Sequence, residues 1–458
     1  MIRRLHQFRR WAGVDRAVFF TNTTQLLRLF TGPVTMALVL RHLTPEIQGY
    51  FYAFAGVVAL QTFLEMGFSQ NILQFAAHEF SKLRFTPSGK IEGDPVALSR
   101  LISLGRLAFG YYAVAAAVAL LVIGVGGDVF FTVSGQHGVA WRGAWWIIAV
   151  TAPLGLAINP AWALLEGCNQ VPAVAQYRFW ASLTAFAANA AALVLGAGIY
   201  VSACVSVVSL LFGVGWLAVF WRPFLVQFLE RPAHGEVSWR REIWPFQWRI
   251  AVSWASGYFI FDILNPVAFY FCGAVDAGRF GMSLQLVRMV MNVALTWVLT
   301  KASRFGMLVA ARVWAELDSL WRRSTAQAFV ICLLGEISLC AAVPLAGRFW
   351  PNLPARLAPI GVTAWLASNM VLQLLVSSFA LELRAHKREP YMWLSVAGAV
   401  CTTGFILPLT KFFGIAGEAV GMALAALVLF IPAWQIYRVK RLEFRHDADM
   451  LARPNSPP

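Results

Sequence analysis

The sequence predicts an all-α polytopic membrane protein with about twelve transmembrane helices, built as two six-helix pseudo-repeats around a central cavity. Three observations predict it. Hydrophobic residues make up 59% of the 458 residues and charged residues only 13%, against about 25% charged in a typical soluble domain. Apolar stretches of helix-spanning length recur along the whole chain, and the basic residues fall in alternate loops. This composition excludes a soluble enzyme with a single membrane anchor.

Twelve apolar stretches are each long enough to cross a bilayer as a helix, which takes about 20 residues. They cover residues 17–40, 50–77, 101–126, 141–165, 173–196, 199–221, 243–271, 279–306, 325–347, 357–383, 391–410 and 413–437. Before the first one, residues 1–16 alternate apolar and Arg side chains, which predicts a basic amphipathic segment on the membrane surface rather than a cleaved signal peptide.

The basic residues predict the orientation. Of the 37 Lys and Arg, 29 lie in segments on the side of the N-terminus, 6 lie on the opposite side, and Arg28 and Arg288 lie within spans. Because cytoplasmic loops carry the excess of Lys and Arg, both termini are expected in the cytoplasm of a cell whose cytoplasmic (inner) membrane holds the chain. The bias also accounts for the net charge of +15, so no nucleic-acid partner is expected.

An internal repeat divides the chain. Gly49, after the first predicted helix, is echoed by Gly278 after the seventh, and the two are separated by half of the 458 residues. Glu166 before Pro172 is similarly echoed by Glu382 before Pro390. We therefore expect halves at residues 17–221 and 243–437, a basic cytoplasmic linker at 222–242, and a basic tail at 438–458. Six crossings per half give both halves one orientation, with a site between them near mid-membrane.

Two helices carry polar stripes with spacings of three and four residues. The first helix has Gln25 and Arg28 among threonines, and the eighth has Gln285, Arg288, Asn292 and Thr296. Such stripes avoid lipid, because an unsatisfied polar group there costs several kcal/mol. They either hold neighbouring helices together or line a cavity. Arginine inside a span costs about 3 kcal/mol or more, which favours the cavity for Arg28 and Arg288.

Two acids are candidates for gating or ion coupling. Glu65 shares a helix face with Gln61 and Ser69, and Asp262 precedes Pro266. Glu65 could instead form a structural pair with Arg28, and Asp262 could be the partner of a helix break. The six cysteines form no CxxC motif, and the histidines lack metal-ligand spacing, so neither a metal nor another cofactor is expected.

Motifs of enzyme chemistry are absent from the sequence. It contains no phosphate-binding loop, no GxSxG and no HExxH, and its predicted outer loops are short. We therefore expect neither an enzyme nor an ATP-driven pump.

Three segments, at residues 41–51, 60–70 and 244–259, resemble the polysaccharide flippase branch of the multidrug/oligosaccharidyl-lipid/polysaccharide exporter superfamily. The resemblance implies a flippase for polysaccharide biosynthesis, which moves prenyl-diphosphate-linked oligosaccharides to the outer leaflet by alternating access. It further implies cationic residues in helices 1 and 8, a position that Arg28 and Arg288 share. The expected partners are the lipid-linked oligosaccharide, the bilayer, and a polysaccharide polymerase or assembly proteins. The chain is expected to be a monomer, and the alternative function is an ion-coupled small-molecule antiporter of multidrug type.

Overall fold

The computed structural model describes residues 16–135, 138–349, 353–386, 388 and 390–450. The predicted surface segment at 1–16 therefore lies almost wholly outside the described residues. The helices before the predicted linker are α2 (Arg16–His42), α3 (Pro45–Val58), η1 (Ala59–Gln61), α4 (Thr62–Glu65), α5 (Phe68–Phe80), α6 (Pro95–Ala119), η2 (Leu120–Val125), α7 (Gly126–Ser134), α8 (Arg142–Ala157), α9 (Asn159–Gly167), α10 (Val171–Val194), η3 (Gly198–Tyr200) and α11 (Val201–Phe220).

The remaining helices are α12 (Arg222–Gln227), η4 (Trp239–Ile243), α13 (Trp244–Phe261), α14 (Leu264–Leu299), α15 (Ala302–Ala311), α16 (Trp314–Phe349), η5 (Pro354–Arg356), α17 (Ile360–Ala385) and α18 (Met392–Met450). One short antiparallel hairpin pairs β1 (Leu83–Phe85) with β2 (Ile91–Gly93).

The described helices can be assigned to the twelve crossings that the sequence predicts. Eight helical stretches are long and apolar enough to span a bilayer, and two of them, Gln247–Ala311 and Met392–His446, are long enough to span it twice. Each of these two contains a glycine in a non-helical conformation, Gly273 in α14 and Gly414 in α18, where the chain can reverse. The other two crossings are α2 and α10, which are 27 and 24 residues long.

The chain divides into two compact units, Met1–Ala255 and Ser256–Pro458. This division lies inside α13, later than the linker at 222–242 that the repeat predicts. The side chain of Gln247 gives the reason. It is fully buried, accepts a hydrogen bond of 2.7 Å from Asn71 Nδ2, and donates one of 2.8 Å to the Met66 carbonyl. The first part of α13 is thus held by the helix 2 region of unit 1.

The second crossing of unit 1 is broken at its middle. Met66 and Gly67 both adopt the left-handed conformation, with φ of 48° and 65°. A Cβ at Gly67 would lie 2.6 Å from Ile250 and 2.7 Å from Trp254, so only glycine fits against α13 here. The break leaves the Leu64 carbonyl without its helical partner, and the Tyr111 hydroxyl donates a hydrogen bond of 2.6 Å to it. Helix 2 therefore runs as α3, η1, α4 and α5.

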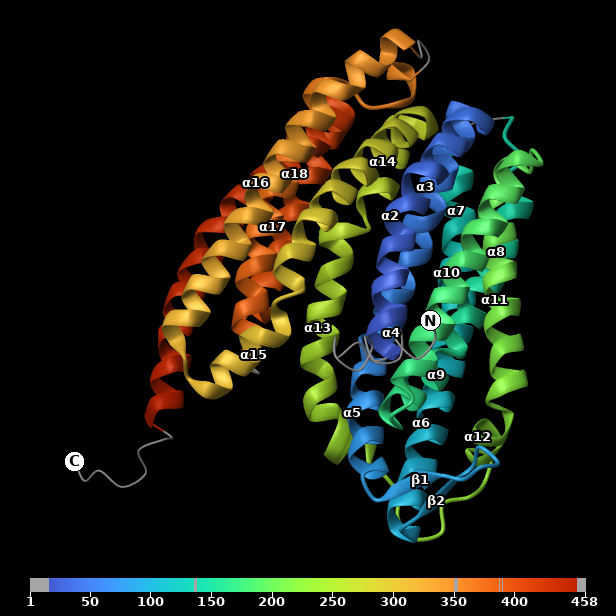
Figure 1. The fold of residues 1–458 in the computed structure, drawn as a ribbon. Coiled ribbons are helices and arrows are strands. Elements are labelled where there is room, and N and C mark those ends of the chain that lie inside the picture. Colours follow the sequence, from blue (N-terminus) through green and yellow to red (C-terminus); the bar gives the residue numbers. More distant parts are fainter. Residues whose placement is uncertain (1–15, 136–137, 350–352, 387, 389, 451–458) are drawn as a thin grey trace, which may run out of the picture. The chain divides into compact units, whose positions relative to one another are not determined.

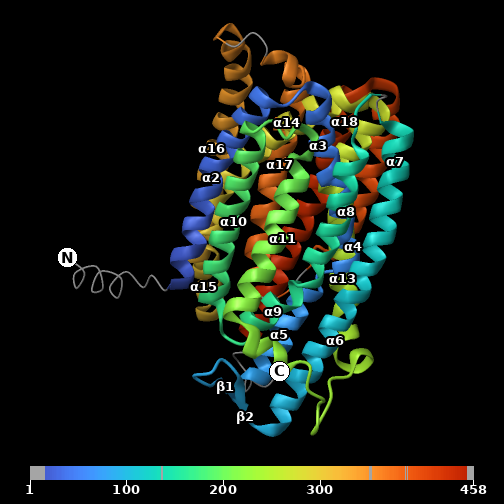
Figure 2. The ribbon, with the colours of Figure 1, turned by 90° about the vertical axis from the view of Figure 1, so that its right-hand side faces the viewer.

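One end of unit 1, predicted to be cytoplasmic, is closed by the β1–β2 hairpin and α12 (Figures 1 and 2). Gln227 of α12 pairs with β2 as another strand would, because it accepts from the Ile91 amide at 2.7 Å and donates to the Ile91 carbonyl at 3.0 Å. Ser99 and Ser103 of α6 accept hydrogen bonds from the amides of His234 and Val237. The linker at 222–242 is therefore bound to unit 1.

Unit 2 has its aromatic core among α16, α17 and α18. Trp321, Phe379 and Tyr437 are buried, and their ring centroids lie 4.9–6.1 Å apart. Two of these helices are longer than the sequence predicts. Helix α16 begins at Trp314 instead of 325, and α18 continues to Met450 instead of ending at 437. The added turns of α16 carry Asp318, and those of α18 carry Arg441 and Arg445. Asp318 forms ion pairs with both arginines, which offsets the cost of removing their charges from water.

Candidate functional site

The predicted stripe on α2 divides into bonded and unbonded residues. Thr24 is buried and donates to the Phe20 carbonyl at 2.7 Å, and Thr35 accepts from Asn189 of α10 at 3.5 Å. Gln25 and Arg28 are exposed, and within the described residues neither side chain has a hydrogen-bond or ion-pair partner. The threonines thus satisfy their hydroxyls within the bundle, while Gln25 and Arg28 remain free to contact a ligand.

Glu65 lies at the end of α4, directly before the left-handed break. It is half-buried and accepts a hydrogen bond of 2.8 Å from Ser69. The alternative structural pair with Arg28 is not formed between these two described residues. Glu65 is therefore held by one hydroxyl at a break in the helix, a position from which a carboxylate can accept a proton or a cation.

Arg288 and Asp262 come together in unit 2. Arg288 Nη2 donates a hydrogen bond of 2.5 Å to the carbonyl of Phe261, the last residue of α13, and its charge interacts with that of Asp262. The carbonyl end of a helix carries partial negative charge, so Arg288 is neutralised from two sides. Arg288 also borders a small cavity of about 40 Å³ with Asn369, Gln373 and Thr402.

The other predicted residues of helix 8 lie along α14. Gln285 is half-buried, whereas Asn292 and Thr296 are exposed, and the Thr296 hydroxyl donates to the Asn292 carbonyl at 3.0 Å. The structure thus places Asp262, Arg288 and this stripe in unit 2 and places Gln25, Arg28 and Glu65 in unit 1.

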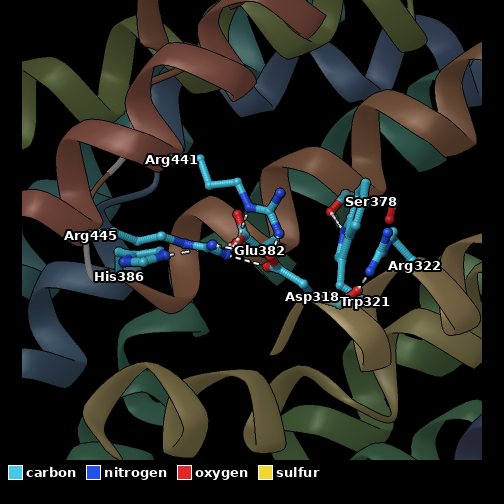
Figure 3. Close-up of polar contacts among 8 residues, drawn as sticks. All are labelled: Asp318, Trp321, Arg322, Ser378, Glu382, His386, Arg441 and Arg445. Carbon is cyan, nitrogen blue, oxygen red and sulfur yellow. Dashed lines mark hydrogen bonds and ion pairs between the residues drawn. The ribbon is translucent and has the colours of Figure 1, made fainter. Parts of the chain in front are cut away.

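Sequence reasoning missed an ion cluster in unit 2, the 318–382 cluster, which consists of Asp318, Glu382, Arg441 and Arg445. Figure 3 shows Glu382 between the two arginines. Glu382 is fully buried, and its Oε1 lies 3.0 Å from Arg441 Nε and 3.5 Å from Arg445 Nη2. Asp318 of α16 pairs with both arginines of α18. The two carboxylates and the two guanidinium groups have no net charge together. Their ion pairs join α16, α17 and α18.

Unit 1 has a smaller counterpart, the 79–242 cluster, formed by Glu79, Arg100 and Glu242. Arg100 donates to Glu79 at 2.9 Å and to Glu242 at 2.6 Å. The pKa of Glu242 lies below its usual value because the Ser238 amide donates to the carboxylate at 2.9 Å and because Arg100 adds a second hydrogen bond. This cluster fastens the end of the linker to α5 and α6.

Two further acids are buried in unit 2. Glu336 of α16 and Glu418 of α18 have both carboxyl oxygens buried without a hydrogen-bond partner in the described part of the chain. The sequence shows both acids within apolar stretches, but their isolation appears only in the structure, because a helix pattern does not reveal which neighbours face a side chain.

Comparison with models of known protein families finds no match, and neither does comparison with curated proteins. Solved structures do match along nearly the whole chain. An inward-facing multidrug resistance MATE family transporter of the MOP superfamily has a TM-score of 0.60 and 17% identity, covering 93% of this chain and 96% of its own.

A MATE structure in the straight conformation has a TM-score of 0.57 and 15% identity, and an outward-facing MATE family transporter has a TM-score of 0.51 and 16% identity. Each of the two covers 94% of this chain and 95% of its own. At these identities the likeness establishes the fold, which is that of MATE transporters.

Proposed function

We propose that this chain is an exporter of the cytoplasmic membrane that moves its cargo by alternating access, with both termini in the cytoplasm. The observation that carries the proposal is the fold. The chain matches over more than nine-tenths of its length a MATE family transporter facing inward and another facing outward. A fold that is found in both conformations supports a mechanism in which one chain alternates between them.

For the cargo, the comparisons favour a small molecule, because the matching structures are described as multidrug resistance transporters. In this function Glu65 and Asp262 are the ion-coupling residues. Glu65 is suited to the role by its half-buried position at the helix 2 break and its single hydroxyl partner. Asp262 faces the charge of Arg288, so its uptake of an ion changes the balance around that arginine.

One specific observation favours a second cargo, a prenyl-diphosphate-linked oligosaccharide. Arg28 is an exposed arginine of a membrane helix and has no partner within the described residues. An unpaired guanidinium is suited to an anionic ligand, because arginine binds phosphate through two parallel hydrogen bonds. In this function Gln25, Gln285, Asn292 and Thr296 contact the cargo, and Arg288 contributes the donors that Phe261 does not use. A polymerase or assembly proteins would take over the oligosaccharide at the outer leaflet. The chain acts as a monomer.

One experiment separates the two cargoes. A strain lacking this chain, with no redundant exporter, is complemented with the wild type, Arg28→Gln, Arg28→Lys or Asp262→Asn. Its lipid-linked oligosaccharides are measured by mass spectrometry, and its ethidium accumulation by fluorescence. Arg41→Gln, an exposed arginine at the end of the same helix, is the matched control.

For a small-molecule antiporter, the deletion raises ethidium accumulation, and Asp262→Asn fails to restore export. For the oligosaccharide, the lipid-linked precursor accumulates, Arg28→Gln fails to clear it, and Arg28→Lys and Arg41→Gln succeed. If neither pool changes in the deletion strain, the exporter proposal is wrong.

A further inference from the structure

A second cavity lies inside unit 1 and contains none of the residues assigned to either cargo. Its volume is about 270 Å³. It lies where two crossings are interrupted, helix 2 at η1 and helix 4 between α8 and α9. Its lining residues come from helices 2, 4, 5 and 6: Gln61, Thr151, Ala152, Gly155, Leu156, Ile158, Asn159, Trp162, Tyr177, Ser206, Ser209 and Leu210.

Several polar side chains of this cavity have no protein partner. Gln61 Oε1 is buried and unpaired. Asn159, Ser209 and the Tyr177 hydroxyl likewise have no side-chain hydrogen bond among the residues that the structure describes. Leaving a buried polar group unsatisfied costs about 1–3 kcal/mol, a cost that applies to the Gln61 oxygen. Asn159 and Tyr177 are half-buried and Ser209 is exposed, so their polar groups are open to a ligand in the cavity.

The cavity wall combines these groups with aromatic rings. Trp162 and Tyr177 are stacked with ring centroids 3.7 Å apart and planes inclined by 11°. The lining also includes the hydroxyls of Thr151 and Ser206, which lie 2.6 Å apart and join α8 to α11. The cavity therefore offers a ligand both an apolar aromatic surface and groups that donate and accept hydrogen bonds.

The lining carries no charged residue. A metal cation requires carboxylate or several carbonyl ligands, and a diphosphate requires arginine or lysine, so neither fits. The volume of about 270 Å³ is also below the roughly 300 Å³ at which pockets for drug-sized molecules begin.

We propose that this cavity binds one uncharged sugar ring, a pyranose. Each hydroxyl of a pyranose both donates and accepts, which matches the amides of Gln61 and Asn159 and the hydroxyls of Tyr177 and Ser209. Its C–H surface matches the aromatic wall of Trp162 and Tyr177. The site extends beyond both candidate functions, because either an oligosaccharide exporter or an antiporter could possess it.

Saturation-transfer NMR tests the proposal on the whole chain, transferred from a non-glycosidic detergent into lipid nanodiscs. The probes are the methyl glycosides of glucose, galactose, mannose, rhamnose and N-acetylglucosamine, with tetraphenylphosphonium and inorganic phosphate as competitors. At least one glycoside is expected to bind saturably, and neither competitor is expected to displace it.

The Gln61→Met variant distinguishes a sugar-binding role of Gln61 from a purely structural one, because stability and sugar binding should change in opposite directions. It removes the unpaired oxygen, so the unfolding temperature without sugar should rise, whereas glycoside binding should weaken about five-fold, the equivalent of one neutral hydrogen bond. Gln74→Met makes the same change at an exposed position of α5 outside the cavity and should alter neither.

Three results would overturn the proposal: no glycoside binds, binding is unchanged in Gln61→Met, or tetraphenylphosphonium or phosphate displaces the sugar. In the first case the cavity holds only water. Because the probes carry neither lipid nor phosphate, the outcome is independent of the export assays with Arg28 and Asp262 variants.

Discussion

The internal repeat predicted from the sequence pairs Glu166, at the end of helix 4, with Glu382, at the end of helix 10, but the two acids have different surroundings. Glu166 pairs with one exposed arginine, Arg178, at 2.8 Å, and its side chain is 14% exposed. Glu382 is fully buried and shares Arg441 and Arg445 with Asp318. The same repeat position is therefore a surface ion pair in unit 1 and the centre of a closed cluster in unit 2.

The interiors of the two units also differ in how their polar side chains are paired. In unit 2 the half-buried arginine of α14, Arg288, is neutralised by the Phe261 carbonyl and by Asp262. In unit 1 four polar residues of the larger cavity, Gln61, Asn159, Tyr177 and Ser209, have no side-chain partner among the described residues.

The comparison teaches that each unit satisfies its polar side chains locally: Arg288 of unit 2 is paired, whereas Glu336 and Glu418 of the same unit are not. Unit 1 likewise pairs Gln247 with Asn71 and leaves the Gln61 oxygen unpaired.

The largest expected effect tests the contrast between the two acids. Glu382→Gln leaves two arginines to share Asp318 alone, and removing one partner of a buried ion pair costs about 3–5 kcal/mol. Glu166→Gln is the matched change in unit 1 and should cost about 1 kcal/mol or less, as surface pairs do. Thermal unfolding of the purified protein in detergent measures both. Equal losses of stability would show that the two sites do not differ in the way that their burial indicates.

A medium effect is expected for the 79–242 cluster of unit 1. Arg100→Met leaves the buried Glu79 and the partly buried Glu242 without their common partner, which should cost about 1–3 kcal/mol. It should also release the linker, so that trypsin cleaves faster at Arg240 and Arg241. Arg84→Met is the control, because Arg84 is exposed and its ion pair with Glu92 does not involve the linker. If both variants are cleaved at the wild-type rate, the cluster does not hold the linker.

The number of crossings was predictable from the sequence, because apolar length and basic loops are properties of the chain alone. Helix 8 was predicted from 279, and the structure begins it just after Gly273. Breaks were harder to predict. The left-handed pair Met66 and Gly67 depends on the close approach of Trp254, which no local pattern shows.

The site was predictable only as stripes of polar residues. The spacing of Gln61, Glu65 and Ser69 predicted one polar face, and Ser69 does bond Glu65. The break at Met66 and Gly67 interrupts that face, and of the three only Gln61 borders the cavity. The sequence could not show that Gln61 borders a cavity with residues of helices 4, 5 and 6. Nor could it show that Arg441 and Arg445 meet Asp318, more than 120 residues earlier, because such contacts depend on which helices pack together.

The smallest effect concerns pH and the 79–242 cluster. The pKa of Glu242 is lowered in the folded protein by the Ser238 amide and by Arg100, whereas the unfolded chain has the ordinary value of about 4.3. A carboxyl with a lowered folded pKa stabilises the protein above the unfolded pKa, and this contribution is lost as the pH falls through the folded pKa. Glu242→Gln should therefore lower stability at pH 7 by about 1 kcal/mol or less, and the difference from the wild type should shrink below about pH 4.3.

Unfolding temperatures measured from pH 7 down to pH 3.5 would record this change. Glu236→Gln is the control in the same linker, because Glu236 is exposed and its side chain has no polar contact among the described residues. A difference between wild type and Glu242→Gln that stays constant over this range would mean that the Ser238 and Arg100 contacts do not favour the charged carboxylate. The linker would then be held to unit 1 by its other hydrogen bonds, which join it to Ile91, Ser99, Ser103 and Arg106.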